Sequence, residues 1–348
     1  MDQRLTGNRT LPRFIFMLLD EEDRQLQDIT ASILGGDLTL SSDRLGGSGN
    51  LSLIDPGIDF GSHRLLISYD PGITGVDAWS LGVWLFASPK TTITATHIRT
   101  DVGLLSKLMV IEEASIAGVS EFSTQLQILS QVESLIRSTG ETRLAVTPSP
   151  KTLSEPWALD AAQTLLTICN QALDAAGYWA VSVNGQGQYV LEPQPEPSRR
   201  PIVWVFTEDE ISVIAPDQTD ESDTASVPNQ FLAYTTGSDD HAPLVGVATD
   251  QDPNSRFSTL SRGRVIEQRD QVEASSQDDI NAIASRRLAG LQSPTSKRNV
   301  SHAMLPIWPR QVVQHIRRDG ATAKFTINKL SFNLTFDAQM NAEWRQIK

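Results

Sequence analysis

The chain of 348 residues is poor in the residue types that metal, redox and nucleic-acid sites require. Its one cysteine, Cys169, excludes a disulfide within the chain and a thiolate metal cluster. The formal net charge of −13 disfavours a surface that neutralises phosphate groups. No apolar run approaches the roughly 20 residues that span a bilayer, so we expect no membrane segment. The sequence therefore excludes an internal disulfide and a thiolate cluster, and it disfavours a nucleic-acid-binding surface and a membrane span.

Catalytic and ligand-binding motifs are missing as well. No histidine has another at i+4, and we interpret all five as structural or solvated. They are His63, His97, His241, His302 and His315. Residues 46–50 end in asparagine where a nucleophile elbow needs glycine, and are typical of a flexible hairpin loop. Residues 217–223 lack the glycine and glutamate of an EF-hand, which predicts a solvated loop. We therefore predict no catalytic residue, no cofactor site and no metal ligand.

The first hundred residues are typical of a β-rich domain. Short segments with alternating or β-branched residues are separated by glycine and proline turns, which favours a barrel or a sandwich. These segments are 36–40, 49–54, 65–69, 79–86 and 91–98. The apolar run 14–19 is too short for a signal peptide and is followed at once by four acids, so we predict an opening strand and a chain that stays in the cytoplasm where it is made.

Residues 101–180 change to helical spacing. Asp101 is a candidate cap for a helix that carries Leu104, Leu105, Leu108 and Met109, and a second helix is predicted over 126–140. A third is predicted from about 156 to 176, because its leucines share one face and Gly177 can end it. The Asn-Gly-Gln-Gly sequence at 184–187 predicts a hairpin turn.

The last 150 residues combine strands with uneven charge. We predict strands at 203–206 and 211–214, a polar surface loop over 215–230, and a helix over 277–291 capped by Ser275 or Ser276. Residues 206–279 hold sixteen acidic and four basic side chains, whereas 280–348 hold three acidic and eleven basic ones. Acidic loops that solvate the surface would explain this. The alternatives are subunits that meet through complementary charge, or acids that line a pore for DNA.

The order of these elements resembles the hub proteins of phage tails, the late-control-D-like baseplate proteins. The likeness rests on five segments of the sequence. They are Gly-Asp-Leu-Thr-Leu at 36–40 followed by Gly-Asn-Leu-Ser-Leu at 49–53, the strand 79–86 before Ser88-Pro89, Pro156-Trp157 at the predicted helix start, the helix at 280–291, and the closing strand at 329–336. In particular, the chain looks like the hub-type minor tail proteins of actinobacterial siphophages.

This resemblance implies a mainly β (α+β) fold with two tube-like β-barrel domains, an inserted α/β domain and helical insertions. The first barrel would cover residues 1–105 and the insertion 106–200. The second barrel would cover 201–348, with the acidic loop and the helix 277–291. Three copies would form a pseudo-hexameric ring that links the tail tube to the tip and lines the channel for DNA ejection.

The implied partners are tail components. They are two further copies in a homotrimer, a distal tail protein or tail-tube ring, central-fibre or tip proteins and the tape measure protein. DNA would pass through the lumen without specific binding. The protein would act in the virion tail tip after synthesis in the host cytoplasm, and we predict no enzymatic activity.

Two alternatives stay open at this point. One is a cell-wall glycoside hydrolase with an unrecognised carboxylate pair. The other is a carbohydrate-binding receptor protein that exposes some of its seven tryptophans, among them Trp79, Trp84, Trp157 and Trp179.

Overall fold

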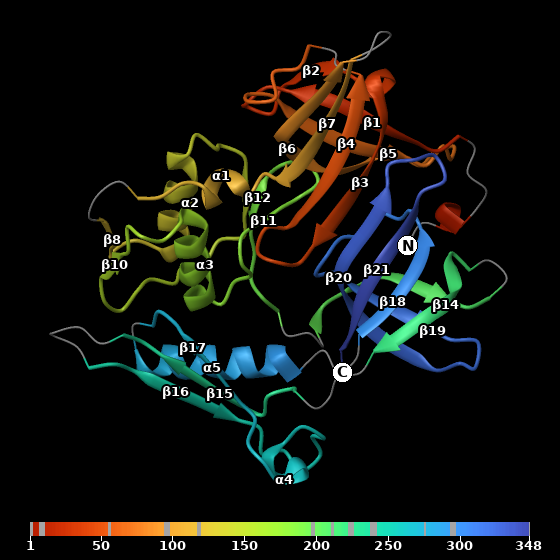
Figure 1. The fold of residues 1–348 in the computed structure, drawn as a ribbon. Coiled ribbons are helices and arrows are strands. Elements are labelled where there is room, and N and C mark those ends of the chain that lie inside the picture. The colour runs from red at the N-terminus through yellow and green to blue at the C-terminus, as the bar shows by residue number, and fades with distance from the viewer. Residues whose placement is uncertain are drawn as a thin grey trace.

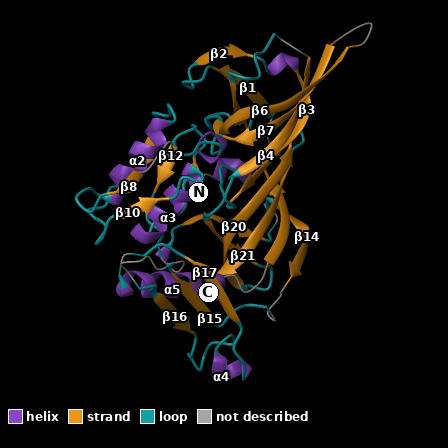
Figure 2. Ribbon diagram, turned by 60° about the vertical axis from the view of Figure 1, so that its left-hand side comes forward, coloured by secondary structure: helices purple, strands orange, loops and turns teal. Residues whose placement is uncertain are grey.

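The computed structural model is mainly β, as the sequence predicts, and its strands form large antiparallel sheets. The description below covers residues 3–6, 11–54, 57–93, 98–116, 120–195, 199–209, 212–221, 226–236, 242–274, 276–292 and 297–347. In Figure 2 the long strands β3, β4, β20 and β21 lie on one side of the molecule, and the helices α2, α3 and α5 lie on the other. Within the described residues, no helix is long and apolar enough to span a bilayer.

A 13-stranded sheet joins strands from residues 13–106 to strands from residues 202–347 (Figure 1). Its strands follow the order β14-β18-β21-β20-β3-β4-β7-β6-β5-β1-β2, with β19 beside β20 and β13 beside β19. In the first part they are β1 (Arg13–Leu19), β2 (Gln25–Asp28), β3 (Ile33–Ser41), β4 (Gly47–Ile54), β5 (Arg64–Asp70), β6 (Trp79–Ile93) and β7 (Ile98–Ser106). In the last part they are β13 (Ile202–Thr207), β14 (Ile214–Glu221), β18 (Lys297–Ala303), β19 (Val312–Ile316), β20 (Thr322–Asn333) and β21 (Gln339–Ile347). Short 3₁₀ turns lie at Gln3–Thr6 and Thr30–Ser32.

Strand β20 connects the two β-rich halves. One of its edges pairs with β21, and the other is divided between β19 and β3. Its residues Lys329 to Asn333 lie opposite Ser41 to Asp37 of β3, so the halves form one continuous sheet. Closure of either half into a tube-like barrel stays a prediction.

One face of this sheet is buried in a shared core. Leu38 and Leu40 of β3 alternate with polar neighbours and pack with Leu330 and Phe332 of β20. Phe332 stacks on Phe14 of β1 with ring centroids 6.2 Å apart. Each such side chain stabilises the fold by about 1.5–3 kcal/mol when it leaves water. The period-2 burial pattern therefore fixes which face points inward.

The segment between β7 and β13 forms an α/β unit with its own core. Thr164 caps α3 by accepting a hydrogen bond from the Thr167 amide, and Gly177 ends it at φ 82°. The elements of this unit are α1 (Met109–Glu112), β8 (Ser120–Phe122), α2 (Ile128–Ser138), β9 (Leu144–Val146), β10 (Trp157–Leu159), α3 (Leu165–Ala176), β11 (Ser182–Val183) and β12 (Tyr189–Leu191). The hairpin turn predicted at 184–187 joins β11 to β12 and is confirmed. The division of the chain at residues 105 and 200 stays a prediction.

A smaller third core lies within the C-terminal part of the chain. The helix predicted over 277–291 is confirmed as α5, with Ser276 Oγ accepting a hydrogen bond from the Asp279 amide. It packs on a three-stranded sheet (Figure 1). The elements are β15 (Gln230–Tyr234), β16 (Val245–Thr249), α4 (Thr259–Arg262), β17 (Glu267–Gln271) and α5 (Gln277–Gln292).

Several predictions from local pattern are wrong, among them the strand predicted at 211–214, where β14 begins only at Ile214. Asp101 caps no helix, because β7 extends to Ser106 between its neighbours β4 and β6. The helix predicted from 156 begins only at Leu165, because Trp157 and Ala158 pair as a strand with β8. The predicted polar loop at 215–230 is strand β14 up to Glu221, because it pairs with β18.

The glycines predicted to form a flexible loop at 46–50 lie instead at the start of β4. A Cβ at Gly49 would lie 2.4 Å from the Asp37 carbonyl oxygen of β3, and Gly47 has φ 148°, where other residues are strained. These glycines therefore let two strands approach closely.

Candidate functional site

The face of the large sheet opposite the core carries mostly hydroxyl and amide side chains. They recur at alternate positions of each strand and lie opposite one another across the strands. The residues of this polar face are Thr219, Asn299, Ser301, Asn341, Glu343, Arg345, Lys329, Ser331, Asn333, Asp37, Thr39, Ser41, Ser48, Asn50, Ser52 and Asp101. The polar face crosses the junction between β20 and β3, so it extends over both halves of the chain.

Cross-strand hydrogen bonds order these side chains. Ser301 Oγ donates to Asn341 Oδ1 at 2.6 Å, and Asn50 Nδ2 donates to Asp37 Oδ1 at 3.1 Å. Ser52 donates to Asp101, and this hydrogen bond, together with those from Arg99, lowers the pKa of the Asp101 carboxyl. Such pairs across strands contribute about 0.2–1 kcal/mol each.

The charges on the polar face are few and of both signs. Glu343 accepts hydrogen bonds from Lys297 at 2.8 Å and from Asn328 at 2.7 Å. Burial alone would raise the pKa of Glu343, but these partners hold it below its ordinary value. Lys329 and Arg345 lie on the same face as Asp37 and Glu343. A surface of this composition offers many weak hydrogen bonds, and the cations Lys297, Lys329 and Arg345 lie around the carboxylate of Glu343.

The acidic and basic segments of the C-terminal part pair within the chain. Asp220 of β14 accepts a hydrogen bond from Arg298 Nη2 of β18 at 2.7 Å, and the hydrogen bonds from Arg298 lower the pKa of Asp220. Asp270 of β17 lies 3.5 Å from Arg287 of α5. These pairs account for part of the charge asymmetry without a second subunit. Of the acids in 206–279, those from Asp250 on lie in β15–β17, α5 and their connections, which are not part of the large sheet.

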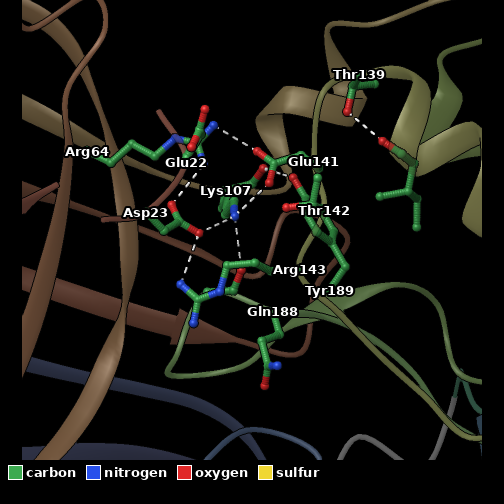
Figure 3. Close-up of polar contacts among 12 residues, drawn as sticks. Glu22, Asp23, Arg64, Lys107, Thr139, Glu141, Thr142, Arg143, Gln188 and Tyr189 are labelled. Atoms are coloured by element: carbon green, nitrogen blue, oxygen red, sulfur yellow. Dashed lines mark hydrogen bonds and ion pairs between the residues drawn. The ribbon is translucent and has the colours of Figure 1, made fainter. Parts of the chain in front are cut away.

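A cluster of buried charges joins the large sheet to the α/β unit (Figure 3). Lys107 is fully buried and bridges the carboxylates of Asp23 and Glu141 at 2.6 and 2.7 Å. Arg64 of β5 binds the same two carboxylates, both at 2.8 Å. Arg143 lies 3.4 Å from Asp23 at the edge of the cluster. Two acids therefore share three bases from distant parts of the chain, and the buried charges are compensated.

The remaining groups of this ion cluster complete its hydrogen bonds. Lys107 Nζ donates to the Gly187 carbonyl at 3.0 Å, and the Tyr189 hydroxyl donates to the Lys107 carbonyl at 2.9 Å. Burial and the nearby charge of Glu141 raise the pKa of Tyr189, so this hydroxyl stays protonated. Burial alone would lower the pKa of Arg64, but Asp23 and Glu141 raise it overall. The cluster is thus a fixed structural contact.

Sequence reasoning missed the ion cluster. Its members lie far apart in the sequence, and only Lys107 carries a local signal, as the single charge within the apolar stretch 102–111. The carboxylates of Asp23 and Glu141 are 1% and 5% exposed and held by cations, so this pair is closed to a polysaccharide.

The histidines and tryptophans lie mostly in the interior. His302 and His315 are buried next to Trp344, with ring centroids about 6 Å away. The backbone amide of Asp59 donates a hydrogen bond to His63 Nδ1. His97 and His241 lie outside the described residues. All seven tryptophans are buried or half-buried, which disfavours a sugar-binding platform on the surface. Among the described residues, no group of three acid, histidine or cysteine side chains could hold a metal ion.

Comparison with known proteins finds similarity in structure alone. No protein-family model matches the sequence, and no curated protein matches it. A tail protein from Neisseria meningitidis superimposes with a TM-score of 0.69 at 12% identity, over 97% of each chain. The 43 kDa tail protein of prophage MuSo2 from Shewanella oneidensis gives a TM-score of 0.65 at 11% identity, over 95% of this chain and 98% of that one.

A type VI secretion system component from E. coli, described as structurally similar to phage T4 tail proteins, gives a TM-score of 0.54 at 8% identity. This chain covers 74% of its length, and the superposition includes 91% of this chain. The protein therefore shares its fold, over at least nine tenths of its length, with phage tail proteins and with a type VI secretion component.

Proposed function

We propose that this protein is a structural subunit of a phage tail, a hub of the tail tip that forms a ring and performs no catalysis. The observation that carries this proposal is the full-length superposition on the Neisseria tail protein, which covers 97% of both chains. Since no large part of either chain is left over, the likeness extends beyond a shared domain.

The ring would be a trimer with pseudo-hexameric symmetry. Two hairpins, β3–β4 and β20–β21, meet edge to edge at the centre of the large sheet, one from each half of the chain. Three copies would place six such hairpins around one axis, which suits a part that joins a six-fold tube to a three-fold tip. The ring would contact the tail tube or distal tail protein on one side, and tip, fibre and tape measure proteins on the other.

The polar face is our candidate for the wall of the DNA channel. Its hydroxyl and amide groups stay solvated, and cations on it lie beside carboxylates, with Lys329 opposite Glu343 and Arg99 bound to Asp101. Duplex DNA binds proteins chiefly through Lys and Arg that neutralise phosphates, so this wall would let DNA slide. The sequence suggested that an acidic lumen would keep DNA from adhering to the wall. Uncharged hydroxyl and amide groups on the polar face would have the same effect.

Native mass spectrometry and an image of the purified tail tip test this proposal. We expect a species of three chains and a ring in which Ser48 and Asn333 face the channel. Replacing both with lysine (Ser48→Lys with Asn333→Lys) should leave folding unchanged, because both side chains are exposed, but should slow DNA ejection. The control, Ser130→Lys with Ser134→Lys on the exposed side of α2, adds the same charge elsewhere.

A protein that stays monomeric within the tail tip would contradict the ring. A face variant that ejects DNA as fast as the α2 control would contradict the assignment of the wall.

A further inference from the structure

A deep crevice of about 1180 Å³ lies where the large sheet, the α/β unit and the segment after Met304 meet. Strand β6 forms one wall, the β11–β12 hairpin a second, and residues 308–312 a third. Its volume exceeds the range of about 300–1,000 Å³ that is typical of small-molecule sites. The crevice is therefore large enough for a segment of polypeptide.

Two arginines at this crevice form no ion pair with the described residues, although the carboxylate of Glu192 lines the same crevice. Arg200 and Arg310 both stack on the ring of Trp179, with guanidinium carbons 4.6 and 5.3 Å from its centroid. Arg200 Nε donates to the Pro195 carbonyl at 3.4 Å, and Arg310 Nη1 donates to the Ala180 carbonyl at 2.9 Å. Neither forms an ion pair with any described residue, in contrast to the arginines of the ion cluster.

Burial makes this pair of cations costly. It lowers the pKa of Arg200, and it lowers that of Arg310, where Glu192 acts in the opposite direction and Arg200 adds to the lowering. Arg310 also has φ 71°, a left-handed conformation that costs a residue other than glycine about 1 kcal/mol or more. A fold that places strain and unpaired charge at one position is typical of a binding site.

The same crevice contains hydrogen-bond donors without acceptors. The indole N–H groups of Trp79, Trp84 and Trp308 are buried, and none has an acceptor among the described residues. Trp84 is 3% exposed, so water cannot readily satisfy it. A buried donor left unpaired costs about 1–3 kcal/mol, and these nitrogens lie beneath the surface of the crevice, so they add to the cost of the fold here and are not exposed to a ligand.

We propose that this crevice binds an extended acidic peptide segment of a partner protein. A carboxylate of the segment lies against Arg200 and Arg310, and the rest of the segment lies along the walls formed by β6 and the β11–β12 hairpin. The charge argues for an acidic occupant because guanidinium and carboxylate groups form strong paired hydrogen bonds. The volume argues for a peptide over a small anion. The identity of the partner as another tail component rests on the proposed function. The acidic peptide chemistry of the site is independent of it.

The test uses the full chain and two acetylated eight-residue peptides, one of alternating glutamate and glycine and one of alternating glutamine and glycine. Calorimetry and tryptophan emission report binding, since Trp179 and Trp308 line the crevice. We expect the glutamate peptide to bind at least tenfold more tightly than the glutamine peptide. Replacing both arginines with glutamine should reduce its affinity at least tenfold and weaken its salt dependence.

The matched control is Arg13→Gln with Arg137→Gln, which removes the same charge from exposed side chains elsewhere and should bind as the wild type does. If the double variant at the crevice fails to fold, the single variant Arg200→Gln is measured in its place. Equal affinity for the two peptides, no binding at millimolar peptide, or unchanged binding by the crevice variants would overturn the inference. A trimer that binds no acidic peptide contradicts this inference alone, whereas a monomer that binds it contradicts the ring alone.

Discussion

Replacing the buried Lys107 with methionine should destabilise the protein more than any single surface change. Lys107 is fully buried and bridges Asp23 and Glu141, so methionine keeps the volume but removes the cation between two buried carboxylates. Breaking a buried ion pair from one side costs about 3–5 kcal/mol. A domain of ordinary stability has about 5–15 kcal/mol in total, so the loss is a large fraction.

Guanidinium chloride unfolding, followed by circular dichroism and tryptophan emission, measures this loss. With a slope of about 4 kcal/mol/M, a loss of about 4 kcal/mol lowers the midpoint by about 1 M. We expect the transition of the α/β unit to shift most, because the ion cluster joins it to β5 and the β1–β2 turn. The two probes should then separate, since two-state behaviour fails when one unit unfolds first.

Arg24→Ala is the matched control. Arg24 also forms two ion pairs, with Asp20 and Glu22, but its side chain is 67% exposed. Exposed pairs contribute about 0–1 kcal/mol, so this variant should unfold close to the wild type. If Lys107→Met unfolds at the same midpoint as Arg24→Ala, the ion cluster does not stabilise the junction and our reasoning is wrong.

Other predictions concern the three cores. A Cβ at Gly246 of β16 would lie 2.7 Å from a backbone oxygen of α5, so Gly246→Ala should lower the free energy of unfolding in urea by about 1–3 kcal/mol. Gly290 of α5 has open space around it, so Gly290→Ala should stabilise the protein. Equal effects of the two variants would contradict this packing. Burial raises the pKa of Cys169 to about 12, so a thiol reagent at pH 8 should label it only in denaturant, and rapid labelling of the native protein would refute its burial. Burial and Arg298 lower the pKa of His315, so the unfolded state binds its proton first as pH falls. Stability should therefore decrease from about pH 7 toward pH 5, and His315→Gln should flatten this slope; an unchanged slope would exclude His315 as its cause.

Several local elements could be predicted from the sequence because a few neighbouring residues encode them. The hairpin at 184–187 needs only its turn residues, and helix α5 needs its apolar spacing and the cap at Ser276. Gly177 ends α3 because glycine adopts the left-handed conformation without strain. The mainly β character could be predicted from the alternation of apolar and polar residues. In the structure, this alternation places the apolar side chains of the paired strands on the core side of the sheet.

The wrong predictions share a cause. Residues 101–106 carry leucines at a spacing compatible with a helix, and 215–221 are polar enough for a loop. Both became strands because a neighbouring strand was present to pair with them, β4 and β6 in one case and β18 in the other. Propensity is a weak guide where tertiary pairing supplies the hydrogen bonds.

By itself, the sequence determined the class of the fold, the positions of its clear turns and caps, and the lack of any familiar catalytic or metal-binding motif. Only the tertiary structure decided that the two β-rich halves share one sheet, that Asp23, Arg64, Lys107 and Glu141 meet, and that Arg200 and Arg310 lie side by side at a crevice. The physical reason is separation along the chain. Local signals act over a few residues, whereas strand pairing and charge compensation join residues whose distance in the sequence carries no pattern.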